Sequence, residues 1–340
     1  MRFTDHTRPA IVVLALSVLG AACGGSTEAG GGASAGLSGT IAISGSSTVQ
    51  PITQLVAERF AGANPDVQIS VDGPGTGDGF VLFCEGTTDV SDASRPMKEE
   101  EAAACADAGV DYVELEIGLD GITVLTNPAN DVASCLTTGD LYALFGPESR
   151  GFGSWSDANA LAEAVGGTGG FPDEPLGIVA PGEESGTYDA FIDLAGIEDV
   201  AMARGVSEDL TGSLRPDYQS SANDTVIIQG IEGSPTELGF VGFAYADLQG
   251  DGVKKLEIDA GQGCVPPSAA SISDGTYPLS RSLYVYVNTA KAAESETLAA
   301  FVDHLLSEGG MAAVTDADYV ALPEERIEAA RAAWEGATAG

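Results

Sequence analysis

Three short segments combine glycine with serine or threonine in a pattern that could bind an anion. They are residues 44–48 (SGSST), 73–79 (GPGTGDG) and 182–187 (GEESGT). In each, the pattern predicts a strand, a turn and then a helix. The first turn of a helix offers unpaired backbone N–H groups and the positive end of the helix dipole, and nearby hydroxyls add donors. The three segments therefore predict an anion site that needs little net positive charge.

Helix capping alone explains any one of these turns, because serine and threonine commonly cap helices. Three turns in one chain, together with Arg95 in residues 93–96 (ASRP), favour the anion site. The glycines of residues 73–79 do not match the G-x-G-x-x-G spacing, and no G-x-x-x-x-G-K-[ST] segment occurs. A Ser–His–Asp triad would need His304, which we expect on the surface of a C-terminal helix.

The charge balance excludes a nucleic-acid partner. The 340 residues include 14 Lys and Arg against 51 Asp and Glu, for a net charge of −37. Proteins that bind nucleic acids need a basic surface to neutralise phosphates. With 44% hydrophobic and 19% charged residues, the chain has the composition of a folded protein with one large or two smaller domains.

The N-terminal residues indicate export. Residues 1–22 combine two arginines with an apolar run too short to span a membrane, which is typical of a signal peptide. Small residues lead to Cys23 in a pattern that resembles a bacterial lipobox; ordinary secretory cleavage is the alternative. Residues 23–38 are rich in Gly, Ala and Ser and predict a flexible tether. We therefore expect lipidation at Cys23 and a location in the cell envelope, on the extracytoplasmic face of the membrane.

Four further cysteines, at positions 84, 105, 135 and 264, suggest two disulfides in an exported chain. Three pairings are possible. The short loop favours Cys84–Cys105, which leaves Cys135–Cys264. We expect no metal site, because no C-x-x-C occurs and only His304 remains after residues 1–22 are removed.

Strand and helix patterns alternate along the chain and predict an α/β class. We expect strands over residues 40–44, 67–71, 112–125, 176–180, 240–243 and 283–287, with residues 118–121 interrupting the third. We expect helices over residues 48–64, 79–85, 188–195, 225–231, 294–306 and 324–334.

From about residue 40 to residue 334, the chain resembles the substrate-binding proteins of phosphate-specific ABC transporters. The segments that carry the resemblance are residues 45–51 (GSSTVQP), 88–96 (TDVSDASRP), 184–189 (ESGTYD), 238–245 (LGFVGFAY), 277–281 (YPLSR), 318–323 (DYVALP) and 331–334 (RAAW). The resemblance implies a type II periplasmic-binding-protein fold, in which two α/β lobes joined by two crossovers close on inorganic phosphate. Lobe I would comprise residues 39–119 and 288–340, and lobe II residues 120–287. We expect a monomer that delivers phosphate to the permease of an ABC importer, without a cofactor or catalysis.

The resemblance also implies the ligands of the phosphate. Donors would come from the three turns, and Arg95 would be the charged partner, suited to bidentate contact with an oxyanion. The donors are Ser47, Thr48, Thr76, Ser185, Gly186 and Thr187. One branch of the family has Asp at the position of Arg95 and Arg at that of Pro181. The missing Asp accepts the proton of phosphate and so rejects sulfate. Asp224 is our candidate replacement, or a helix cap; Asp78 and Glu184 are further candidates.

Other functions remain open at this point. The same fold could bind sulfate, molybdate or another oxyanion, and an acceptor for the ligand's proton would distinguish phosphate from these. An exported phosphatase would need a nucleophile with an identifiable base, or metal ligands, and the sequence suggests neither. An adhesin or sensor domain could keep the fold without transport.

Overall fold

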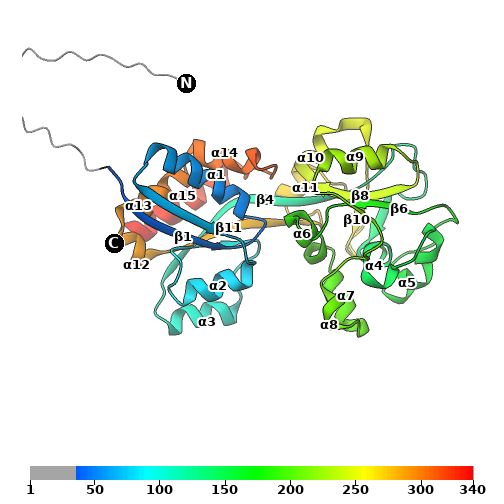
Figure 1. Cartoon of the computed structure of the whole chain (residues 1–340), viewed down its shortest axis with the longest axis horizontal. Helices are drawn as coiled ribbons and strands as arrows, with labels where there is room; N and C mark the ends of the chain where they lie inside the picture. The colour runs from blue at the N-terminus through cyan, green and yellow to red at the C-terminus, as the bar shows by residue number, and fades with distance from the viewer. Residues whose placement is uncertain (1–35, 340) are drawn as a thin grey trace, which may run out of the picture. The chain divides into compact units, whose positions relative to one another are not determined.

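Strand β4 (Tyr112–Thr126) runs through the middle of a nine-stranded sheet. The computed structural model describes residues 36–339 (Figure 1), so the predicted signal peptide, Cys23 and most of the predicted tether lie outside the described residues. The strand order is β2-β1-β3-β11-β4-β8-β6-β7, and β9 also pairs with β4. The other strands are β1 (Gly39–Gly45), β2 (Val67–Asp72), β3 (Val90–Ala93), β5 (Cys135–Thr137), β6 (Gly177–Ala180), β7 (Gln219–Ser220), β8 (Glu237–Gly242), β9 (Lys254–Lys255), β10 (Glu257–Asp259) and β11 (Ser280–Asn288). Strands β5 and β10 form a separate parallel pair.

The two halves of β4 belong to different parts of the sheet. Tyr112–Gly121 pairs with β11, and Ile122–Thr126 pairs with β8. The chain thus leaves the first lobe along β4 and returns to it along β11, which makes the two crossovers that the resemblance implies. β11 also pairs with β3 over Tyr284–Val287, inside the first lobe. The lobe boundaries stay a prediction, and this pairing favours a return near Ser280 rather than after Val287.

Helices pack on the sheet in both lobes (Figure 1). They are α1 (Gln50–Ala63), α2 (Thr76–Cys84), α3 (Glu99–Asp107), α4 (Thr138–Phe145), α5 (Asn159–Ala164), α6 (Gly186–Leu194), α7 (Ile197–Arg204), α8 (Glu208–Thr211), α9 (Asp224–Glu232), α10 (Phe243–Leu248), α11 (Ala269–Ser273), α12 (Thr289–Glu294), α13 (Glu296–Leu305), α14 (Glu308–Asp316) and α15 (Glu324–Thr338). Short 3₁₀ helices span Pro147–Ser149, Trp155–Ala158 and Gly250–Gly252. Within the part of the chain that the structure describes, no helix has both the length and the apolar character needed to cross a membrane.

The predicted interruption of β4 at residues 118–121 is wrong, because the strand is continuous. Its two glycines serve close packing. A Cβ on Gly118 would lie 2.9 Å from Val314 of α14, and one on Gly121 would lie 2.6 Å from Ile272 of α11. The sequence shows glycines that break the strand pattern, but not the helices that need the space they leave.

His304 is not the surface residue that we expected. It lies in α13, half-buried, with its ring centre 5.5 Å from that of Phe60 in α1. Its Nε2 atom is buried without a hydrogen-bond partner among the described residues. Burial, and then the charge of Arg59, lower the pKa of His304. The residue is a packing element between two helices.

Candidate functional site

The first two predicted turns meet at one edge of the sheet. β1 is parallel to both β2 and β3, so the carboxyl ends of all three strands lie at the same edge. Gly45, at the end of β1, has a φ of +150°, and a Cβ there would lie 2.0 Å from the carbonyl oxygen of Asp92 in β3. A larger residue would push the two strand ends apart, so glycine is required for the first turn to lie beside β3.

The first turn is organised by Ser46. Its buried Oγ accepts hydrogen bonds from the backbone N–H groups of Thr48 and Val49, at 3.2 and 3.4 Å. These bonds hold the chain as it enters α1, which begins at Gln50, two residues later than the sequence predicted. The side chains of Ser47 and Thr48 thereby come to line a cavity.

The second turn docks directly on the first. The N–H of Gly75 donates to the carbonyl oxygen of Gly45 at 2.9 Å, and a Cβ on Gly79 would lie 2.4 Å from the Cα of Gly45. Helix α2 begins at Thr76, whose hydroxyl accepts the N–H of Ser94 at 3.2 Å. The helix starts three residues earlier than predicted, so Thr76 is its first residue and also lines the cavity.

The third turn lies against the backbone of the first. Ser185 caps α6 by accepting the N–H of Thr187 at 3.2 Å. A Cβ on Gly186 would lie 3.4 Å from the carbonyl oxygen of Ser47. Ser185, Gly186 and Thr187 do not themselves line the cavity; α6 contributes residues from its later turns instead.

The cavity has a volume of about 430 Å³ and unites most of the predicted ligands. Four predicted residues line it: Ser47, Thr48, Thr76 and Arg95. Sequence reasoning missed six further polar residues on its wall: Ser46, Ser94, Asp189, Asp193, Glu198 and Arg281. Two arginines and three carboxylates therefore face the same space as the hydroxyls.

Arg95 lines the cavity, and its guanidinium is also paired with a carboxylate of the protein. Its Nη1 and Nη2 donate to the carboxylate of Glu101 in α3, at 2.8 and 2.7 Å. The guanidinium carbon lies 5.5 Å from the ring centre of Phe80. The bond to Glu101 raises the pKa of Arg95. The side chain is 30% exposed, so the guanidinium is anchored on one side and open on the other.

Arg281 is the second arginine of the site. It comes from β11 and contacts three separate segments: Nη2 donates to Thr48 Oγ1 at 3.0 Å, Nε to Asp120 at 3.3 Å, and Nη1 to Asp193 at 2.6 Å. Its side chain is 11% exposed. The residue stood in the segment 277–281 that carried the resemblance, but no local pattern distinguishes it from a surface arginine.

Two carboxylates next to the first turn have shifted pKa values. Asp189 of α6 accepts the hydroxyl of Ser47 at 3.2 Å, and burial raises its pKa. Asp92 is fully buried beneath the turn, where its Oδ2 accepts the hydroxyl of Thr53 at 2.6 Å. Burial raises the pKa of Asp92 to about 7. Asp189 is thus a carboxylate that faces the cavity, and Asp92 is one that supports it from below.

The three carboxylates named as proton acceptors lie elsewhere. Asp224 is the first residue of α9, after the capping residue Asn223, and does not line the cavity. Burial, and then the charge of Asp318, raise its pKa. Asp78 is exposed on α2, and Glu184 lines a separate cavity of about 400 Å³ in lobe II. The role of Asp224 stays a prediction.

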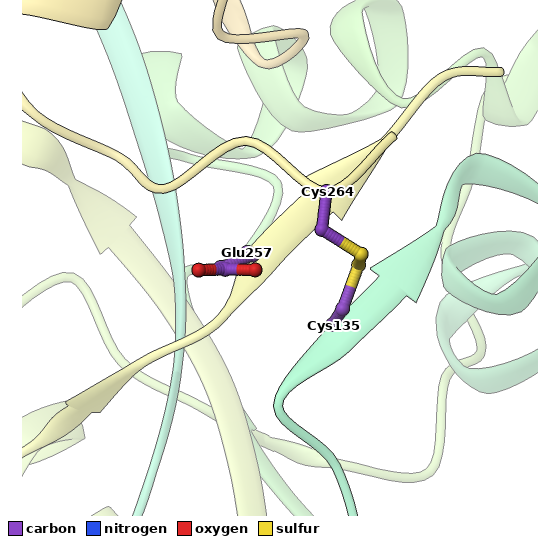
Figure 2. A group of neighbouring side chains, drawn as sticks. All are labelled: Cys135, Glu257 and Cys264. Carbon is purple, nitrogen blue, oxygen red and sulfur yellow. A yellow bond between two sulfur atoms is a disulfide. The ribbon is translucent and has the colours of Figure 1, made fainter. Parts of the chain in front are cut away.

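Both predicted disulfides are confirmed: Cys84–Cys105 joins α2 to α3, and Cys135–Cys264 holds the chain beside the β5–β10 pair. Figure 2 shows the second with the carboxylate of Glu257 next to it. These three residues form the one group with metal-ligating side chains that we find among residues 36–339. Its two sulfurs are bonded to each other, and the thiolates that a metal would need are therefore absent.

Comparisons with known proteins place these observations in a family. The family model described as the PBP superfamily domain matches residues 30–309. Protein SphX of Synechocystis sp. is 39% identical over 288 residues, which cover 84% of this chain and 79% of that protein. The phosphate-binding protein PstS of Staphylococcus epidermidis is 32% identical over 314 residues, with coverage of 92% and 88%.

Solved structures agree with this assignment. The crystal structure of a possible phosphate binding protein from Planctomyces limnophilus has a TM-score of 0.79 and 37% identity, covering 88% of this chain and 99% of that one. An ABC-type phosphate transport receptor from Vibrio cholerae, with a TM-score of 0.59 and 22% identity, shares the fold over 83% of this chain and 100% of that one. The predicted two-lobed binding-protein fold is confirmed.

Proposed function

The chain belongs to the family of the PBP superfamily domain, and from this premise we propose that it binds inorganic phosphate outside the cytoplasm and delivers it to an ABC importer. The observation that carries the proposal is the cavity, where Ser47, Thr48 and Thr76 meet two arginines at the start of α1 and α2. The names of the relatives PstS and of the Planctomyces protein support phosphate as the ligand.

Phosphate suits this arrangement because a tetrahedral oxyanion needs donors from several directions. The start of each helix supplies N–H groups and a positive dipole end, and the hydroxyls add donors. Arg95 and Arg281 supply charge through planar guanidinium groups, which can pair with two oxygens at once. The third turn lies against the carbonyl oxygen of Ser47, and Ser185, Gly186 and Thr187 would supply further donors to the same ligand from there.

The remaining parts of the proposal follow from the expected role. The protein binds phosphate reversibly and turns nothing over, works as a monomer, and passes its ligand to the membrane permease of the importer. The lipid on Cys23 would keep it at the extracytoplasmic face of the membrane, within reach of that permease.

Calorimetric titration of the purified protein tests this function. We expect saturable binding of phosphate at micromolar concentrations or below and none of sulfate at the same concentrations. Tighter binding of sulfate or molybdate would assign the site to another oxyanion. Turnover of phosphate esters that survives repurification would assign the protein to the phosphatases.

A further inference from the structure

The ion pair between Arg281 and Asp193 joins a buried cation to an exposed anion. The side chain of Arg281 is 11% exposed, whereas that of Asp193 on α6 is 66% exposed. Their atoms Nη1 and Oδ2 lie 2.6 Å apart. Both residues line the cavity in which we place the ligand.

The other polar contacts of Arg281 are internal. Nε donates to Asp120, whose side chain is 5% exposed, and Nη2 donates to the buried hydroxyl of Thr48. Of these three hydrogen bonds, the one from Nη1 has an exposed acceptor, the carboxylate of Asp193. An anion that enters the cavity and pairs with Arg281 through Nη1 meets the carboxylate of Asp193 on the same nitrogen, and the two negative charges repel each other there.

The two partners differ in what they lose when the pair breaks. The buried guanidinium of Arg281 loses one of two carboxylate partners but stays paired with the buried Asp120, so its charge is still partly compensated. When the exposed carboxylate of Asp193 leaves the pair, water hydrates it again, so it loses little free energy. Arg281 thus keeps one anionic partner in Asp120, and Asp193 is suited to be an exchangeable second one.

We propose that Asp193 occupies Arg281 while the anion site is empty and that the bound oxyanion displaces it, so that Asp193 lowers the affinity of the site. The proposal rests on the proposed function, since it requires that the cavity bind phosphate. It assigns α6 a part in setting affinity that is separate from the donors at its N-terminus.

Removal of the Asp193 carboxylate tests the proposal. Asp193→Asn keeps an acceptor oxygen without the charge, and Asp193→Ala removes the acceptor. We expect both variants to bind phosphate more tightly than the wild type by calorimetry, by roughly fivefold for an exposed pair. Asp199→Asn is the matched control, because Asp199 is exposed on neighbouring α7 and does not line the cavity. Its affinity should change by less than about twofold, which measures the effect of net charge alone.

A second measurement separates this role from general support of the fold. Without phosphate, both Asp193 variants should melt at a lower temperature than the wild type, because Arg281 has lost one of its two carboxylate partners. With saturating phosphate, the difference should disappear. If the wild type binds phosphate and both variants bind it equally well or more weakly, the proposal is wrong and the phosphate function still stands. A wild-type protein that binds no phosphate would overturn both.

Discussion

The carboxylate of Asp189 in α6 accepts the hydroxyl hydrogen of Ser47 in the first turn, 142 residues earlier in the chain, at 3.2 Å. Both residues line the cavity, and burial raises the pKa of Asp189. If Ser47 donates its hydroxyl hydrogen to a bound anion, the carboxylate oxygen of Asp189 loses this donor. That oxygen can then accept a hydrogen bond from a protonated ligand. Phosphate carries such a hydrogen near neutral pH, and sulfate does not.

We therefore expect Asp189→Asn to reduce the preference for phosphate over sulfate. The side-chain amide of this variant can donate a hydrogen bond to an unprotonated sulfate oxygen, which the wild-type carboxylate repels. The sulfate affinity should therefore rise, and the phosphate affinity should fall. Calorimetric titration with each anion gives the ratio. Asp224→Asn is the comparison, because Asp224 was the acceptor proposed from the sequence. If Asp224→Asn changes the ratio and Asp189→Asn does not, the acceptor is Asp224.

Replacement of Arg95 should weaken phosphate binding. A hydrogen bond to a charged group contributes roughly 1.5–3 kcal/mol, so Arg95→Ala should raise the dissociation constant by about tenfold or more. Arg95→Lys should restore only part of the affinity, because the planar fork is lost. The same titration measures both variants. Glu101→Gln is the control, since it removes the negative charge that pairs with Arg95 but keeps the guanidinium. An unchanged phosphate affinity of Arg95→Ala would place the site elsewhere.

Asp92 should make the stability of the protein depend on pH. Burial raises its pKa from 3.8 to about 7, so in this interval the folded protein holds a proton that the unfolded chain has lost. Stability therefore falls as the pH rises from about 4 to about 7, by on the order of 4 kcal/mol.

Asp92→Asn removes this dependence, because an amide does not ionise. Relative to the wild type, the variant should gain more melting temperature at about pH 8 than at about pH 4. The exposed Asp66 provides the control Asp66→Asn, for which the difference should stay constant. If the melting temperatures of the wild type and of Asp92→Asn change in parallel between about pH 4 and pH 8, the pKa of Asp92 is not raised as stated.

Salt should accelerate the binding of phosphate. The net charge of −37, with Asp193 and Glu198 on the cavity wall, repels an approaching anion. The Debye length falls from about 30 Å at 0.01 M to about 10 Å at 0.1 M salt, so screening relieves this repulsion. The contacts within a closed site are short and change little. Stopped-flow measurements with a fluorescent label near the cavity should show a rising on-rate and a nearly constant off-rate. An on-rate that falls steadily with salt would indicate an exposed basic site instead.

Local patterns allowed much of the fold to be predicted from the sequence. Helical patterns located α1, α13 and α15 to within a few residues, and one face of each helix packs on the core. The hydroxyls of the first two turns were found because they stand where a strand ends and a helix begins. The short separation of Cys84 and Cys105 was enough to favour the correct pairing.

The sequence by itself thus determined several of the main elements, the turns and the class of ligand, since each of these depends on neighbours in the chain. Only the tertiary structure decided which charges share the cavity. Arg281 meets Asp193, Asp120 and Thr48 across 88, 161 and 233 residues, and no periodicity or spacing records such contacts. The continuity of β4 through Gly118 and Gly121 was decided in the same way, by side chains of α14 and α11 that occupy the space of the missing Cβ atoms. These features arise because segments that are distant in the sequence pack against one another, and no local sequence pattern shows which segments do so.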